Sequence, residues 1–326
     1  MIFLALGIFL VFWSVRKIPD SGWLAVKSAL VNARYWLIFP VMATLLLSHY
    51  SRARRWRILI EPLGYKPRMA NTYMSVLIGY LANLAIPRLG EVLKCTILAR
   101  YEKVPADKLV GTIVAERAFD VLCLCLVIVI TFLTQVDLIG GYLREILDEI
   151  IKSKSISLSK IIILVAIIVI IIGVALYIFK KYAHISFMQK LKTILTSIWH
   201  GITSIRYLKN KSWFIFHTIF IWSMYLLSVR IGMYALSETS VYGFKESLSV
   251  LTTGSLAIII PTPGQGLGVY PIFVQKTMLL YGLSEGLGFA FGSILWAVQF
   301  FQVIISGFIA LTIIPLFNKN NNHAKS

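Results

Sequence analysis

Long apolar runs, separated by short polar and basic segments, dominate the pattern of the chain. The apolar runs that stand out are residues 1–15, 35–50, 109–134, 158–179, 212–236 and 287–315. About 20 apolar residues in a helix cross the hydrocarbon core of a bilayer. The pattern therefore predicts an all-α polytopic membrane protein with about six full spans.

Two further apolar stretches, residues 69–100 and 244–281, are each interrupted by proline and glycine. The first is interrupted at Pro87 and the second at Pro261. Proline removes a backbone donor and glycine permits unusual dihedral angles, so each helix should break there. Broken backbone at membrane depth is tolerated where it is buried in protein or lines a wet cavity. We therefore predict two re-entrant broken-helix hairpins; the alternative is that proline and glycine only kink two ordinary spans.

The polar segments indicate how the spans are oriented. The basic cluster at residues 51–57 and the segment 180–212, which has seven Lys/Arg and no acidic residue, are expected on the cytoplasmic side. The segment 137–157 is near charge balance and is expected outside. With both termini cytoplasmic, this topology closes only if residues 69–100 enter and leave from the cytoplasm and residues 244–281 from outside.

These assignments describe one transmembrane domain, residues 1–326, built as an inverted repeat. Its halves are about 35–134 and 212–315, and an amphipathic helix at about 185–208 is predicted to lie on the cytoplasmic membrane surface between them. Tryptophan beside the arginines of residues 51–57 is typical of an interfacial anchor at the end of a helix. Paired interruptions in two halves of opposite orientation are typical of a transporter binding site.

Composition supports a lipid environment. Hydrophobic residues make up 58% of the chain and charged residues 14%, against about 25% charged in soluble domains. The net charge of +18 comes from clusters between apolar runs, which indicates orientation and contact with anionic lipid rather than nucleic acid. Expected partners are membrane lipids; a lipid-synthesising enzyme and a second copy of the chain are further candidates.

Charged residues follow the first break and begin the next span. Three of them, Arg88, Glu91 and Lys94, recur at a spacing of three and share a helix face, and the other three are Glu116, Arg117 and Asp120. Charges at membrane depth usually pair, face a cavity or do work. The six charges sum to zero, so we predict a neutral, paired network around a hydrated crevice; the alternative is solvated charge at the cytoplasmic interface.

The second break carries hydroxyl, amide and backbone groups instead. A helix restarting near residues 266–268 would direct its positive dipole end into the crevice, which suits a phosphate. Trp296, Gln299 and Gln302 are expected on the opposite wall. The candidate substrate-binding residues are Asn83, Arg88, Gly90, Glu91, Lys94, Glu116, Arg117, Asp120, Pro261, Thr262, Pro263, Gly264, Gln265, Gly266, Gly268, Tyr270 and Gln299. We expect no metal site, cofactor or catalytic residue.

Three motifs resemble the lysylphosphatidylglycerol synthase transmembrane-region family of flippase-like membrane domains. They are Pro87-Arg88-Leu89-Gly90-Glu91-Val92-Leu93-Lys94, Glu116-Arg117-Ala118-Phe119-Asp120 and Pro261-Thr262-Pro263-Gly264-Gln265-Gly266-Leu267-Gly268-Val269. The resemblance covers essentially the whole chain and implies a lipid-translocating role. The chain departs from the family at Tyr270, where an acidic residue is usual, so a proton-coupling role of that carboxylate does not carry over. With the chain ending at Ser326, we expect a stand-alone member without an aminoacyltransferase domain.

The function expected from these observations is transbilayer movement of a polar, anionic or zwitterionic lipid in the bacterial cytoplasmic membrane. The sequence contains no Gly-x-x-x-x-Gly-Lys-Ser/Thr loop, so movement is expected to be downhill or ion-coupled. One alternative is an intramembrane enzyme acting on lipid headgroups or lipid-linked sugars. The histidines His49 and His217 are interpreted as packing or interface residues, which weakens that alternative. The other is a scaffold subunit of a lipid synthase.

Overall fold

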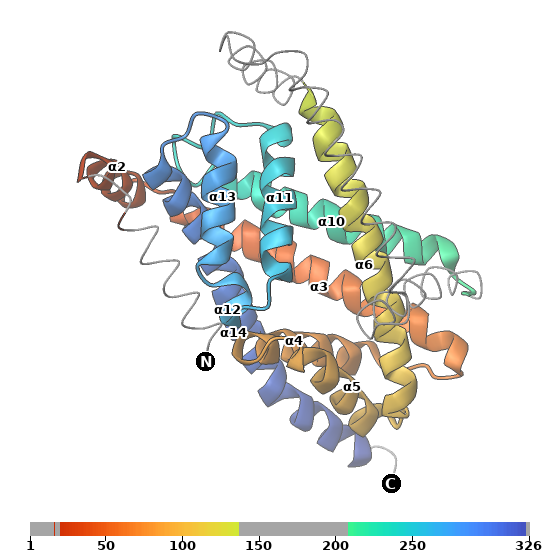
Figure 1. Cartoon of the computed structure of the whole chain (residues 1–326). Helices are drawn as coiled ribbons and strands as arrows, with labels where there is room; N and C mark the ends of the chain where they lie inside the picture. Colours follow the sequence, from red (N-terminus) through yellow and green to blue (C-terminus); the bar gives the residue numbers. More distant parts are fainter. Residues whose placement is uncertain (1–15, 17–19, 137–207, 324–326) are drawn as a thin grey trace, which may run out of the picture.

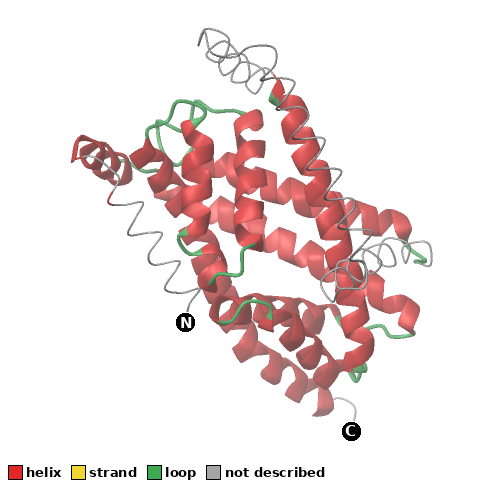
Figure 2. Cartoon of the chain, viewed as in Figure 1, coloured by secondary structure: helices red, strands yellow, loops and turns green. Residues whose placement is uncertain are grey.

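The computed structural model describes residues 16, 20–136 and 208–323, and every regular element in these ranges is helical (Figures 1 and 2). The predictions for residues 1–15, 137–157, 158–179 and 185–207 lie outside the described residues. The elements are α2 (Asp20–Val31), η1 (Tyr35–Leu37), α3 (Ile38–Ile60), η2 (Glu61–Leu63), α4 (Met69–Ala85), α5 (Leu89–Glu102), α6 (Ala106–Thr134), α10 (Lys211–Met233), α11 (Phe244–Ile259), α12 (Pro263–Gly266), α13 (Val269–Leu279) and α14 (Glu285–His323).

Helices α3 and α10 cross the centre of the molecule side by side (Figure 1). They run antiparallel, because Leu59 near the end of α3 packs in one cluster with Phe214 near the start of α10. At the opposite end, the backbone amide of Arg34 donates to the carbonyl of Ala235 at 2.8 Å. This central pair carries one wall of the cavity described below.

The first broken stretch forms a helical hairpin, α4 and α5. Ile86, which precedes Pro87, is extended with φ −133°, as expected for a residue before proline. Arg88 then adopts φ +69°, and α5 begins one residue later. The two helices touch backbone to backbone, since a Cβ added at Gly90 would lie 1.8 Å from the carbonyl oxygen of Gly79. Glycine at the crossing is therefore required by space.

The second broken stretch also turns back on itself, through a longer break. Helix α11 ends at Ile259, the one-turn α12 follows, and α13 begins at Val269. Gly264, Gln265, Gly266 and Gly268 all have positive φ, from +53° to +93°. Several consecutive residues in this region are costly without glycine, so the glycines of this motif are what permits the turn. Both predicted hairpin shapes are therefore present.

The hairpins pack in a reciprocal arrangement. Each lies against the helix that follows it, α5 on α6 and α13 on α14, and also against the long helix of the other half, α4 on α14 and α11 on α6. Among the described residues, α10 and residues 285–319 of α14 are long and apolar enough to cross a membrane, and α2 with α3 forms a pair bent by 70° that also qualifies. The six-span count and the inverted repeat stay predictions.

One boundary prediction is wrong. The span of residues 35–50 was expected to end in an interfacial basic cluster, but α3 continues without interruption to Ile60. Arg52 and Arg55 are buried inside the bundle and Trp56 is fully buried, while Arg54 alone of the first three arginines is exposed. The cluster is divided between two faces of one helix, because its arginines point in different directions around the axis.

Candidate functional site

A cavity of about 400 Å³ opens between the two hairpins. Residues of both breaks line it, together with residues of α3, α6, α10 and α14. Its polar lining residues are His49, Arg52, Tyr80, Asn83, Arg88, Glu91, Arg117, Asp120, Trp222, Tyr225, Ser228, Ser255, Thr262, Gln265, Tyr270, Gln299 and Gln302. The structure thus brings together two segments separated by about half the chain, as the paired interruptions predicted.

Most of the predicted site residues line this cavity. They are Asn83, Arg88, Glu91, Arg117, Asp120, Pro261, Thr262, Gln265, Tyr270 and Gln299. Gly90, Gly264, Gly266 and Gly268 do not line it; they shape the breaks behind the lining. Lys94 and Glu116 are also absent from the lining and lie buried beside it. Trp296, expected on the opposite wall, instead donates its indole N–H to the carbonyl of Gly264 at 3.0 Å.

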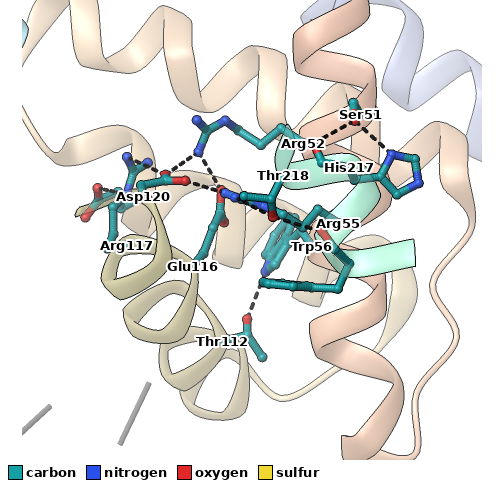
Figure 3. Close-up of polar contacts among 12 residues, drawn as sticks. Ser51, Arg52, Arg55, Trp56, Thr112, Glu116, Arg117, Asp120, His217 and Thr218 are labelled. Carbon is teal, nitrogen blue, oxygen red and sulfur yellow. Dashed lines mark hydrogen bonds and ion pairs between the residues drawn. The ribbon is translucent and has the colours of Figure 1, made fainter. Parts of the chain in front are cut away.

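Charged side chains from α3, α5 and α6 form one buried network beside the cavity, and Figure 3 shows its members from α3 and α6. Glu116, which is fully buried, lies 2.8 Å from Arg52, 3.6 Å from Arg55 and 2.9 Å from Lys94. Asp120 lies 2.7 Å from Arg52 and 2.6 Å from Arg55. Glu116 therefore bridges cations of α3 and α5, and Asp120 joins α6 to both arginines of α3. Unpaired charge at membrane depth is expensive, so the network fixes α3, α5 and α6 relative to one another.

A second, more exposed pair extends the network towards the cavity. Arg117 lies 2.9 Å from Glu91 on α5 and 3.6 Å from Asp120. The side chains of Arg117 and Glu91 are 42% and 33% exposed, against 0% for Glu116. The exposure of the charged side chains thus increases from the buried Glu116 to the accessible Arg117.

The network is not neutral, and this corrects the predicted balance. Its members are four cations, Arg52, Arg55, Lys94 and Arg117, and three carboxylates, Glu91, Glu116 and Asp120, which leaves one positive charge. The two arginines of α3 were missed because a basic cluster beside tryptophan is typical of a membrane interface. Their i,i+3 spacing, which puts both on one helix face, is the signal that pointed inward.

Arg88 does not join the network as predicted. It is exposed at the tip of the first hairpin, lines the cavity, and makes no ion pair among the residues described. Its φ of +69° is uncommon for a residue with a side chain. The amide of the following glycine, Gly90, is held by the Asn83 side-chain oxygen at 2.8 Å. The hairpin tip thus presents an unpaired guanidinium at the cavity.

The second hairpin contributes uncharged groups. Thr262, Gln265 and Tyr270 line the cavity from the break, and Tyr270 packs against Gly254, where a Cβ would lie 2.6 Å from the phenol ring. The lysines of this hairpin, Lys245 and Lys276, do not line the cavity, and Lys276 pairs with Glu285 of α14 at 2.9 Å. The two sides of the cavity therefore differ in chemistry: charge on the first side, hydroxyl and amide groups on the second.

His49, interpreted from the sequence as a packing residue, belongs to the site. It is buried, lines the cavity, and its Nε2 lies 3.2 Å from Oε1 of Gln302 on α14. Its ring packs at a tilt against the ring of Tyr80, with the two ring centroids 4.4 Å apart. No sequence pattern links these residues, because 253 positions separate His49 from Gln302. Within the described ranges, no group of three or more His, Cys, Asp or Glu could hold a metal ion.

Comparison with known proteins supplies the family. Residues 1–307 match the family described as lysylphosphatidylglycerol synthase TM region, so the chain belongs to this family, as its three motifs predicted. A UPF0104 membrane protein of Methanocaldococcus jannaschii is 29% identical over 86 residues, which cover 26% of this chain. That match spans 24% of the relative's length. No solved structure matches the chain significantly.

Proposed function

We propose that this member of the lysylphosphatidylglycerol synthase transmembrane-region family moves an anionic or zwitterionic lipid headgroup across the membrane through the cavity between its hairpins. The observation that carries the proposal is the unpaired Arg88 at the tip of the first hairpin, beside a network with an excess positive charge. A guanidinium offers a rigid, bidentate fork to a phosphate and keeps its charge. An anionic phosphate would bind there.

The walls of the cavity suit a lipid because they are amphipathic. Val121, Ile258 and Ile259 line it and are themselves 45%, 43% and 59% exposed. Exposed aliphatic side chains beside a charged cavity would contact acyl chains while the headgroup lies among polar groups. We therefore propose that the tails stay in the bilayer as the headgroup passes through.

The ion pairs of the cavity carboxylates support a binding role for these two groups rather than acid–base catalysis by them. A general acid or base acts through a group free to exchange its proton with the reacting atom. The carboxylates that line the cavity, Glu91 and Asp120, both hold cations, Arg117 at 2.9 Å and Arg52 at 2.7 Å. They support binding and helix position instead. We propose a cytoplasmic-membrane location with both termini cytoplasmic, supported by the basic segment of residues 180–212 in the sequence.

Reconstitution distinguishes the proposal from its two alternatives. The purified chain would be placed in liposomes holding a trace of tail-labelled phosphatidylglycerol, and the label reduced from outside by a membrane-impermeant reagent. Leaflet exchange above that of empty liposomes supports transport. Chemical conversion of the lipid, read by mass spectrometry, would indicate an enzyme. Absence of both would favour a scaffold and refute the proposal.

An Arg88 series makes the test specific. Arg88→Gln should lower exchange by about tenfold to a hundredfold, because one charge-assisted phosphate contact contributes about 1.5–3 kcal/mol. Arg88→Lys should retain part of the exchange. Lys276→Gln, which removes a cation that does not line the cavity, is the matched control and should behave as the unaltered protein. Equal exchange by Arg88→Gln and the unaltered protein would contradict a role for this guanidinium.

A further inference from the structure

A chain of hydrogen bonds on α14 determines which nitrogen of His49 carries its proton. The Ser306 hydroxyl donates its single proton to the backbone carbonyl of Gln302, at 2.8 Å. Its oxygen can therefore only accept from the Gln302 side-chain amide, whose Nε2 lies 3.1 Å away. The amide is thereby oriented with Nε2 towards Ser306 and Oε1 towards His49.

The consequence at His49 follows directly. Because Oε1 of Gln302 can only accept, the His49 Nε2 atom, 3.2 Å away, must be the donor. A neutral imidazole carries one proton, so Nδ1 holds a lone pair. That atom is buried and has no hydrogen-bond partner among the described residues. Buried polar atoms are normally satisfied, and this one belongs to a residue that lines the cavity.

We infer that His49 reads the headgroup of the transported lipid by accepting a hydrogen bond at Nδ1 from a hydroxyl of that headgroup. The inference rests on the proposed transport function and adds a requirement for the substrate beyond its phosphate. A neutral donor suits this place, because the acceptor is an uncharged imidazole nitrogen. The carboxylates beside it, Glu116 and Asp120, already hold Arg52 at 2.8 and 2.7 Å, so neither is free to pair with a headgroup ammonium.

The remaining groups near His49 suit the same ligand. Tyr80 covers the imidazole ring and lines the cavity, and the Tyr225 hydroxyl accepts from Arg52 at 3.3 Å. A phenol that accepts from Arg52 still has its own proton to donate. Tyr225 therefore offers a donor to the same cavity, which an oxygen of the headgroup can accept. The cavity then has two parts: a guanidinium for the phosphate and a neutral acceptor for the hydroxyl.

Two lipids that differ only in hydroxyl groups test this directly. Phosphatidylglycerol and phosphatidylpropanol carry the same charge and the same number of headgroup carbons, but the second lacks both hydroxyls. Binding to the purified full chain in detergent would be measured by competition, and leaflet exchange in liposomes. Phosphatidylglycerol should bind about fivefold to tenfold more tightly, as expected for one hydrogen bond to a buried acceptor. Equal binding of the two lipids would overturn the inference.

Substitutions at His49 provide matched variants. His49→Gln can keep a donor near the Nε2 position towards Gln302 but loses the acceptor at Nδ1, so the preference for phosphatidylglycerol should disappear. His49→Asn keeps an acceptor near the Nδ1 position and should retain part of the preference. Ser306→Ala removes the group that orients the Gln302 amide and should weaken the preference without touching the lipid. If His49→Gln folds and still prefers phosphatidylglycerol, Nδ1 is not the acceptor.

The two readouts separate this inference from the transport proposal. A binding preference without leaflet exchange would uphold the role of His49 and refute transport. Exchange of both lipids at equal rates, with equal binding, would uphold transport and refute the role of His49. The melting temperature of each variant checks that it has folded.

Discussion

Both hairpins reverse the direction of the chain between two packed helices, but their helix crossings differ in chemistry. In the first, α4 and α5 meet backbone to backbone at Gly79 and Gly90, and the break takes three residues. In the second, α11 and α13 meet through the Tyr270 ring at Gly254, and the break takes nine residues with four positive φ angles. The first hairpin is tight and joined to a charge network, while the second is looser and lines the cavity with uncharged groups.

That difference indicates that the two sides of the cavity have different roles. Charge needs a rigid frame, because a buried ion pair is stabilising only while its geometry is good. The first hairpin supplies such a frame, with Lys94 and Glu91 of α5 paired to Glu116 and Arg117 of α6. The second hairpin carries no buried ion pair among its described residues. Its backbone is therefore free to place several residues at positive φ beside the cavity.

The largest difference between the hairpins should appear when the charge of Glu116 is removed. Glu116→Gln leaves three buried cations with one carboxylate fewer, at a cost of about 3–5 kcal/mol. The corresponding change beside the second hairpin, Glu285→Gln at the start of α14, breaks the more exposed pair with Lys276, worth about 0–1 kcal/mol. Thermal unfolding in detergent measures both.

A second substitution identifies the cause of the Glu116→Gln defect. If excess positive charge destabilises the variant, Lys94→Met in the same background should restore part of the melting temperature. Unchanged stability in Glu116→Gln alone would show that the network contributes little to the fold.

The next largest effect should come from the two helix crossings. Gly90→Ala places a Cβ against backbone, 1.8 Å from the Gly79 carbonyl oxygen, and must push α4 and α5 apart. Gly254→Ala meets a side chain, Tyr270, which can rotate towards the cavity. Overpacking costs about 1–3 kcal/mol or more, and Gly90→Ala should lie at or above the top of that range.

The controls for this prediction are within the same chain. Gly111→Ala has no atom within 4 Å of the added Cβ, and should be neutral or slightly stabilising. Combining Gly254→Ala with Tyr270→Leu should recover stability on the second hairpin. Equal losses in Gly90→Ala and Gly254→Ala would show that the hairpins do not differ in tightness.

A smaller effect is expected where each hairpin joins the opposite half. Thr252 of α11 lies 2.7 Å from Thr131 of α6, hydroxyl to hydroxyl, and Thr252→Val should cost about 0.6 kcal/mol, the average for such bonds in membrane proteins. On the first hairpin, Asn71 and Asn318 exchange two amide hydrogen bonds, at 2.9 and 3.0 Å. Asn71→Leu should therefore cost more than Thr252→Val in the same unfolding assay. The reverse order would contradict the ranking.

The smallest expected effect concerns backbone strain at Arg88. Arg88→Gly removes the side chain from a residue at φ +69° and should raise stability by less than about 1 kcal/mol. Lipid binding should fall as in Arg88→Gln, because both variants lose the guanidinium. A destabilised Arg88→Gly variant would indicate that the arginine side chain supports the hairpin tip rather than the ligand.

The sequence by itself determined the helical membrane class, the two breaks and the contribution of both breaks to the cavity lining. These follow from local causes: apolar runs of membrane length, prolines that end helices at Ala85 and Ile259, and glycines that permit the second turn. The family was also readable, because its motifs are contiguous. A paired charge network that includes Lys94 and Glu116 was also expected, although the sequence did not indicate that these two residues pair with each other.

Only the tertiary structure decided which charges are buried and which histidine is part of the site. Arg52 and Arg55 resemble an interfacial anchor in sequence, and become the core of the network because α3 continues past them and faces α6. His49 becomes a hydrogen-bonding group of the cavity because α14 presents Gln302 to it. Burial and pairing depend on which helix faces are apposed, and that is a property of packing across distant segments that no local pattern contains.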